Sequence, residues 1–237
     1  MRALVGVGVG PGDPELITVR AVRALREADL VLVPVLDPAE VGRAEATVRA
    51  HVAHDRVRRV VFALDPSRHD AAWQAAAGEV AAAYGTGAET VAFATIGDPN
   101  VYSTFTALAA AVRARLGGDL GVSTIPGITA MQDLAARAGA VLCAGTESLA
   151  LLPLTAGVAA LDRALTHFDT VVAYKGGSRL PAVLDLLRER DRLDGAVYGA
   201  SLGLPGEVVC PAAGLPADRT GPYLSTLIVP ARRGGRP

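Results

Sequence analysis

Three short turns in this chain carry the residues that could bind a polar or anionic ligand through the backbone. Gly10–Thr18 follows a valine-rich stretch, and Thr95–Pro99 and Ile125–Thr129 follow later apolar stretches. Glycines in such turns let a ligand approach backbone N–H groups closely. In open α/β sheets, ligands bind at the carboxyl ends of the strands. The three turns therefore predict a binding cleft assembled from loops.

Asp98 is the side chain in these turns best suited to contact a ligand. Pro99 disfavours the helical region for the residue before it, so Asp98 is expected to be extended at the end of a strand. There its carboxylate can accept hydrogen bonds from a ligand hydroxyl or amine, or from nearby backbone amides. The alternative is that Asp98 only caps the helix that follows.

Several other chemistries fit these residues poorly. After Gly6 and Gly8, the third glycine of a dinucleotide fingerprint is replaced by Pro11, and Asp37 is only a weak match for a ribose-binding acid. No Gly-Lys-Ser/Thr phosphate loop and no Gly-x-Ser-x-Gly nucleophile turn occurs. No metal is expected, because zinc-site spacing is missing among His51, His54, His69, His167, Cys143 and Cys210. The remaining chemistry is to bind and orient a reagent that is already activated.

The elements that must position these turns alternate regularly in the first half of the chain. Strands are predicted at Ala3–Val9, Leu30–Val35, Val57–Ala63 and Thr90–Thr95. Helices are predicted from Thr18 to about Glu27, and at Ala39–His54, His69–Tyr84 and Ser103–Leu116. This βαβαβαβα order predicts a parallel sheet with helices on its faces.

The second half of the chain predicts a mixed sheet. Strands are expected at Val122–Ile125, Ser148–Leu152, Thr170–Tyr174, Gly195–Ala200 and Leu224–Val229, with helices at Thr129–Ala138, Gly157–Leu165 and Leu180–Arg190. The glycine-rich segment Gly117–Gly121 is the expected boundary. It gives an N-terminal α/β domain over residues 1–118 and a C-terminal α/β domain over residues 122–230. Residues 231–237 are expected to form a disordered polar tail.

Composition and charge narrow the choice of partners. A chain of 237 residues can bury a sizeable core, and a net charge of −1 provides no overall field for nucleic acid. No apolar run is long enough to cross a bilayer, and the first residues lack the pattern of a signal peptide. The two distant cysteines suit a reducing compartment. A cytoplasmic protein with no nucleic-acid or membrane partner is therefore expected.

Taken together, the three turns resemble the motifs of the tetrapyrrole (corrin/porphyrin) methylases. Gly10–Thr18 with Ala28–Val31 is similar to the opening motif of that family, Gly97–Phe105 to the second and Ile125–Ala130 to the third. The resemblance continues to Tyr223–Leu227. It implies a homodimer of chains with two α/β domains each. It also implies that S-adenosylmethionine lies in the cleft between the domains and leaves as S-adenosylhomocysteine.

The resemblance further implies which residues contact the cofactor. By matching motifs, these residues are Pro11, Ile96, Gly97, Asp98, Val101, Thr129, Ala130 and Lys175. Lys175 falls where many relatives carry an apolar residue such as methionine, so the implied contact there is through its backbone. The segment Gly199–Leu202 is implied to line the adenine side.

Within the family, the chain most resembles the members that methylate carbon 20 of precorrin-2 in cobalamin synthesis, through Tyr102–Thr104 and Leu204–Glu207 among other features. This small-molecule tetrapyrrole carries many carboxylates, so arginines are expected around it. The candidates are Arg20, Arg43 and Arg179, against the alternative of a solvated helix face.

Glu147 is a candidate base that could instead cap a turn. Two alternatives to the carbon-20 reaction stay open. One is methylation of another tetrapyrrole position, of cobalt-factor II or of a protein side chain. The other is a nucleotide-binding module without catalysis.

Overall fold

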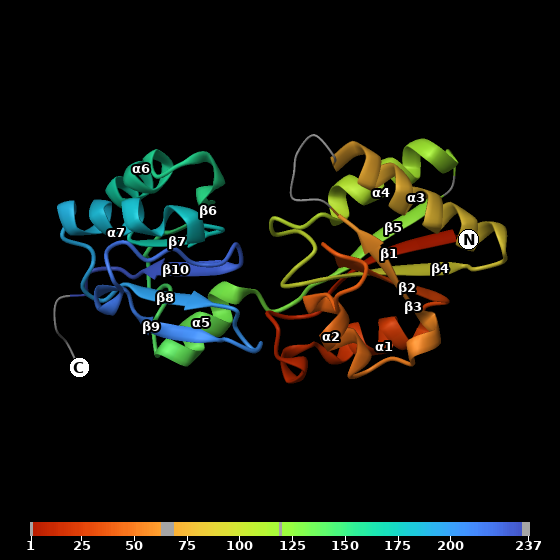
Figure 1. Cartoon of the computed structure of the whole chain (residues 1–237), viewed down its shortest axis with the longest axis horizontal. Coiled ribbons are helices and arrows are strands. Elements are labelled where there is room, and N and C mark those ends of the chain that lie inside the picture. Colours follow the sequence, from red (N-terminus) through yellow and green to blue (C-terminus); the bar gives the residue numbers. More distant parts are fainter. Residues whose placement is uncertain (1, 63–68, 119, 234–237) are drawn as a thin grey trace. The chain divides into compact units, whose positions relative to one another are not determined.

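The computed structural model describes residues 2–62, 69–118 and 120–233 of the chain. Its contacts divide the protein into two compact units, with the division between Thr129 and Ala130. Each unit contains its own five-stranded sheet with helices on both faces, shown in Figure 1. The predicted pair of α/β domains is therefore confirmed as a fold class.

The N-terminal unit is built on a fully parallel sheet with the order β3-β2-β4-β1-β5. The strands are β1 (Arg2–Gly8), β2 (Leu30–Val35), β3 (Val57–Val61), β4 (Thr90–Thr95) and β5 (Leu120–Ile125). The central strands are rich in valine and nearly continuously buried, as expected where helices cover both faces of a sheet. Because all five strands run the same way, their carboxyl ends share one edge.

Two pairs of helices cover the faces of this sheet (Figure 1). On one face, α1 (Val19–Glu27) and α2 (Arg43–Arg49) bury Leu25 and Val48 against Val7 and Val31. On the other face, α3 (His69–Gly85) and α4 (Phe105–Leu116) bury an alanine-rich surface against the sheet. The two clusters hold the strands, and hence their carboxyl-terminal turns, in fixed register.

The sheet of the C-terminal unit is mixed, as predicted, and has the order β6-β7-β10-β8-β9. Its strands are β6 (Leu149–Pro153), β7 (Thr170–Tyr174), β8 (Val197–Ala200), β9 (Val208–Pro211) and β10 (Ser225–Val229). Only β6 and β7 are parallel, and the other neighbours are antiparallel. One face packs on α6 (Ala159–His167) and α7 (Leu180–Glu189), while α5 (Ala130–Ala138) packs on β8, β9 and β10.

The structure differs from the sequence-based expectation at the domain boundary. Residues 117–121 do not separate the units, because β5 pairs in parallel with β1 and completes the first sheet. The division comes only after the turn that follows β5. The glycines suggested a linker, but Gly117 and Gly118 only turn the chain with positive φ angles of 59° and 64° at the end of α4.

Several element bounds also differ from the prediction. Helix α2 starts at Arg43 rather than at Ala39, because Asp37 closes a turn by accepting from the Ala39 N–H. Strand β9 was not predicted, since its four residues carry no clear alternation. In the predicted tail, Ala231 donates its N–H to the Thr170 hydroxyl, so residues 231–233 are held in place. Residues 234–237 and Ala63 lie outside the described part of the chain.

Candidate functional site

The three glycine-containing turns come together at the carboxyl ends of β1, β4 and β5. The Gly97 N–H donates to the Gly10 carbonyl over 2.8 Å, and the two residues form an isolated β-bridge. A Cβ atom on Gly127 would lie 2.1 Å from the Gly97 carbonyl oxygen and 2.8 Å from the backbone of Gly8. A Cβ on Gly8 would lie 2.6 Å from the same carbonyl. Three backbones thus meet at a point where only glycine fits.

Asp98 ties the second turn to the third. Its Oδ2 accepts from the Gly127 N–H over 3.0 Å, and its Oδ1 accepts from the Asn100 N–H over 2.8 Å. The alternative of a cap for the next helix does not hold, because α4 starts at Phe105, whose N–H donates to the Ser103 hydroxyl. Of the roles predicted for this carboxylate, binding to nearby backbone amides is the one that the structure displays.

The first turn is also rigidly held. Pro11 is buried, and the Asp13 carboxylate accepts from the Glu15 N–H over 2.9 Å. Thr18 caps α1 by accepting from the Ala21 N–H over 3.1 Å. The Thr47 hydroxyl of α2 donates to the Gly12 carbonyl over 3.3 Å. These contacts fix the backbone of the turn before any ligand binds.

Of the other residues predicted to bind the cofactor, all but Lys175 lie in or directly after these turns. Ile96 and Val101 are partly exposed on either side of Asp98, and Thr129 is buried at the end of the N-terminal unit. Ala130 is the first residue of α5 in the C-terminal unit. The next residue, Met131, donates its N–H to the Tyr174 hydroxyl over 2.9 Å, which joins the start of α5 to the end of β7. Lys175 immediately follows that strand.

Backbone conformation reveals a feature that the sequence did not. Among the described residues, four non-glycine residues have positive φ. Lys175 at 60° and Ser201 at 52° directly follow strands, and Tyr102 at 48° lies in the loop between β4 and α4. The fourth, Asp191, only ends α7. Left-handed non-glycine residues are strained and gather at functional sites. Ser201 lies in the segment Gly199–Leu202 that was expected to line the adenine side, whereas Tyr102 was not among the predicted contact residues.

The three arginines proposed for the substrate lie in different surroundings. Arg20 is exposed on α1, and Arg179 donates to the Thr155 carbonyl over 3.0 Å. Arg43 is partly buried in the first turn of α2, and burial lowers the pKa of its guanidinium. Its Nη1 is fully buried and makes no hydrogen bond to any described residue. Burying an N–H group without an acceptor costs folding free energy. Of the three arginines, Arg43 is therefore the candidate whose guanidinium a bound anion would stabilise.

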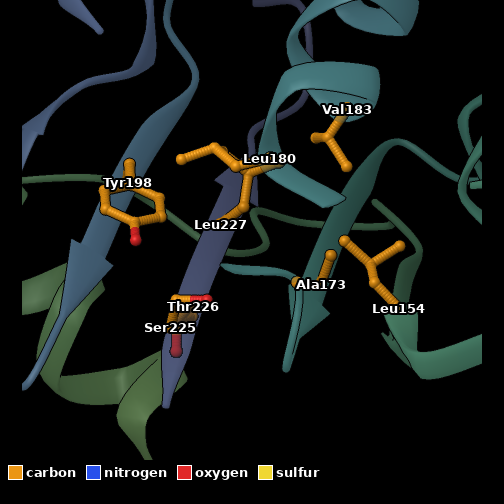
Figure 2. A pocket seen from close by; sticks show the side chains of 9 residues that line it. Leu154, Ala173, Leu180, Val183, Tyr198, Ser225, Thr226 and Leu227 are labelled. Atoms are coloured by element: carbon orange, nitrogen blue, oxygen red, sulfur yellow. The ribbon is translucent and has the colours of Figure 1, made fainter. Parts of the chain in front are cut away.

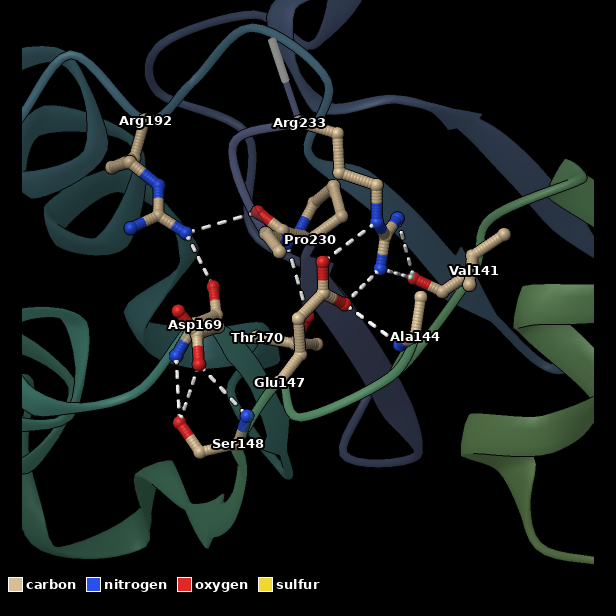
Figure 3. A network of polar contacts seen from close by, with 10 residues as sticks. Val141, Ala144, Glu147, Ser148, Asp169, Thr170, Arg192, Pro230 and Arg233 are labelled. Atoms are coloured by element: carbon tan, nitrogen blue, oxygen red, sulfur yellow. Dashed lines mark hydrogen bonds and ion pairs between the residues drawn. The ribbon is translucent and has the colours of Figure 1, made fainter. Parts of the chain in front are cut away.

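Glu147 lies in a polar network at one end of the C-terminal unit (Figure 3). Its carboxylate accepts from the Ala144 N–H over 2.8 Å and from the Arg233 Nε over 2.9 Å. The hydrogen bonds and charge of Arg233 lower the pKa of this carboxyl. An ionised carboxylate held by a backbone N–H and a guanidinium suits the turn-capping alternative given for Glu147.

We expect Glu147→Gln to lower the melting temperature near neutral pH by a few degrees, because the ion pair with Arg233 is lost. The folded pKa of Glu147 lies below the unfolded value, so its contribution is complete above the unfolded pKa and disappears as pH falls through the folded pKa. Melting curves of the wild type and the variant should therefore converge in acid. A constant difference down to the lowest pH would contradict this role.

A small cavity in the core of the C-terminal unit is not a ligand site. It is lined by residues that include Leu154, Tyr198 and Ser225, shown in Figure 2, and has a volume of about 10 Å³. That is room for about one water molecule. Within the described residues, no group of His, Cys, Asp and Glu could hold a metal ion. Nor does any described helix combine the length and apolar character needed to span a membrane.

Comparison with known proteins identifies the family. Residues 3–214 match the sequence model of the Tetrapyrrole (Corrin/Porphyrin) Methylases. The chain belongs to this family. A methylase of Sinorhizobium sp, named precorrin-2 C(20)-methyltransferase, is 35% identical, with 96% of this chain and 94% of the relative covered. Cobalt-precorrin-2 C(20)-methyltransferase of Salmonella typhimurium is 31% identical, with 95% of each chain covered.

Solved structures of other methylases share the fold of this chain. The uroporphyrin-III C-methyl transferase of Thermus thermophilus, crystallised with S-adenosylhomocysteine, superimposes with a TM-score of 0.65. The match covers 96% of this chain and 97% of that one at 23% identity. Together with the family match, this likeness confirms that the resemblance drawn from the three turns was correct.

Proposed function

We propose that this methylase transfers a methyl group from S-adenosylmethionine to carbon 20 of precorrin-2 in cobalamin biosynthesis. The observation that carries the proposal is the 35% identity, over nearly the full length of both chains, to a relative named for that reaction. The second relative is named for the cobalt-containing form of the same substrate. Parallel incubations with the metal-free and the cobalt-containing substrate distinguish the two.

The residues at the three turns fit a cofactor of this kind. The cradle formed by Gly8, Gly97 and Gly127 holds the backbones of the three turns in close contact, and Gly97 has a left-handed φ of 69°. The proposed contact residues are Pro11, Ile96, Gly97, Asp98, Val101, Thr129, Ala130 and Lys175. S-adenosylmethionine, when bound, supplies an electrophilic methyl sulfonium.

The protein then has to hold the nucleophilic carbon in line with the methyl group, keep water out and let a proton leave. The rigid turns provide orientation, since their backbones are fixed by the Asp98 and Gly10 hydrogen bonds. Arg43, with Arg20 and Arg179, is proposed to bind substrate carboxylates. The proposal also includes a homodimer and a cytoplasmic location.

The test is an anaerobic incubation of the protein with S-adenosylmethionine and enzymatically made precorrin-2, in parallel with its cobalt form, read by mass spectrometry. A gain of one methyl on either substrate would establish the reaction, and NMR of the product would locate it on carbon 20. Methylation of uroporphyrinogen III alone would assign the chain to a different branch of the family. Tight binding of S-adenosylhomocysteine with no transfer to any of the three would indicate a binding module.

A further inference from the structure

Lys175 is chemically unique in this protein. The chain has 23 basic Lys and Arg residues, and Lys175 is the only lysine among them. It occupies a left-handed backbone conformation, with a φ of 60°, directly after β7. A glycine would adopt this conformation without strain, so the position keeps a side chain where the backbone favours none.

The turn that carries Lys175 is locked from several directions. The Lys175 N–H donates to the Ser225 carbonyl over 3.1 Å. A Cβ on Gly176 would lie 2.5 Å from Leu154, and a Cβ on Gly177 would lie 2.2 Å from the Gly221 carbonyl oxygen. The Gly221 N–H donates to the Gly177 carbonyl over 2.8 Å. The segment around Gly221 therefore packs against the turn at Gly177 and holds its backbone in place. As a result, the direction in which the Lys175 side chain leaves the backbone is set by the fold.

The Lys175 ammonium lies over the ring of Tyr223, with 5.4 Å between its Nζ and the ring centroid. Tyr223 is 43% exposed, and Lys175 is itself partly exposed. An aromatic face attracts a cation but takes none of its N–H donors in a strong hydrogen bond. The pair therefore orients a positive charge at the carboxyl end of β7, and an ammonium carries three N–H donors, so it can serve more than one partner.

We propose that Lys175 binds a carboxylate of the ligand through its ammonium, with Tyr223 holding the ammonium in place. The inference rests on the proposed function, which supplies two sources of carboxylate: the amino-acid end of S-adenosylmethionine and the carboxylate side chains of the tetrapyrrole. The lysine is well suited to both, since an ammonium on a flexible stem is a compact donor to a single oxygen. This role adds a side-chain function to a position where only a backbone contact was implied.

Because Lys175 is the only lysine, it can be observed directly. Reductive methylation with 13C-formaldehyde labels its amine, and the same treatment of Lys175→Met assigns the signal by its absence. We expect the Lys175 signal to shift when S-adenosylhomocysteine or uroporphyrin III, a stable tetrapyrrole polycarboxylate, occupies its carboxylate site. The probe that shifts the signal identifies the source of the carboxylate. A signal unmoved by either bound probe would overturn the proposal.

Calorimetric affinities of the two probes provide the matched test. Lys175→Met should weaken one probe about tenfold or more, Lys175→Arg should restore most of that affinity, and Tyr223→Phe should retain it. Lys175→Gly should be at least as stable as the wild type yet bind as weakly as Lys175→Met, which separates ligand binding from folding. Arg23→Met, an exposed change on α1, is the control and should have no effect.

The outcomes separate this proposal from the proposed function. Unchanged affinity of both probes for Lys175→Met, or loss of affinity that Lys175→Arg does not restore, would overturn the role of Lys175 alone. Neither measurement requires turnover, so a failure to methylate precorrin-2 would leave the binding result standing. A wild-type protein that binds neither probe would overturn both.

Discussion

Replacing Gly127 by alanine is expected to abolish S-adenosylhomocysteine binding and to destabilise the N-terminal unit. The added Cβ would lie 2.1 Å from the Gly97 carbonyl oxygen and 2.8 Å from the Gly8 backbone, distances that real Cβ atoms do not show. Both obstacles are main chain, so no side-chain rotation relieves the clash. The third turn would have to move away from the other two, at about 1–3 kcal/mol of folding free energy by analogy with overpacked cores.

Gly121 offers the matched control, since it lies in β5, the strand that leads into the third turn. A Cβ there would lie 3.6 Å from the nearest atom, the Arg2 carbonyl oxygen, which is an ordinary contact. Gly121→Ala should therefore bind S-adenosylhomocysteine like the wild type and melt at a similar temperature. Calorimetry compares the affinity of the two variants for S-adenosylhomocysteine, and thermal melts compare their melting temperatures. Wild-type affinity in Gly127→Ala would refute the meeting of the three backbones as the cofactor cradle.

Removing the Asp98 carboxylate is expected to weaken S-adenosylhomocysteine binding by about tenfold to a hundredfold. Asp98→Ala leaves the Gly127 and Asn100 N–H groups without their acceptor, and a part-buried N–H left unsatisfied costs about 1–3 kcal/mol. The second and third turns would then lose their side-chain link. Asp98→Asn, which keeps one carbonyl oxygen, should show an intermediate loss.

Asp37 provides the control for this measurement. It accepts from the N–H two residues on over 2.8 Å, as Asp98 does, but its turn follows β2 and its carboxylate accepts from no second turn in the described part of the chain. Asp37→Ala should leave the affinity within about twofold of the wild type. Equal losses in Asp37→Ala and Asp98→Ala would show that the link between turns is unimportant. A loss of affinity confined to Asp37→Ala would instead favour a dinucleotide site in which Asp37 binds a ribose.

The sequence predicted the fold class and the three turns because both depend on local patterns. Valine-rich strands alternating with amphipathic helices indicate a parallel sheet, and strands β2 and β7 have the bounds that were predicted. The same patterns misplaced the domain boundary, since glycine density at residues 117–121 cannot distinguish a linker from a helix end. Whether β5 pairs with β1 depends on distant residues.

The partners of individual side chains could not be predicted either. Glu147 is paired with Arg233, which lies 86 residues away in the sequence, and no motif marks that ion pair. Likewise, no sequence pattern marks the left-handed backbones of Ser201, directly after β8, and of Tyr102, in the loop between β4 and α4. The sequence indicates which turns are candidates for binding, whereas long-range contacts determine the conformations that they hold.

The position of β1 in its sheet constrains how the nascent chain acquires structure. This strand lies between β4 and β5, and its Ala3 pairs with Thr90 on one side and with Gly121 on the other. A ribosome must therefore synthesise most of the N-terminal unit before the first strand finds any neighbour. Until then, β1, an apolar strand that is buried on both faces in the folded protein, is exposed to other chains. Chaperone binding to the emerging polypeptide would matter most during that interval.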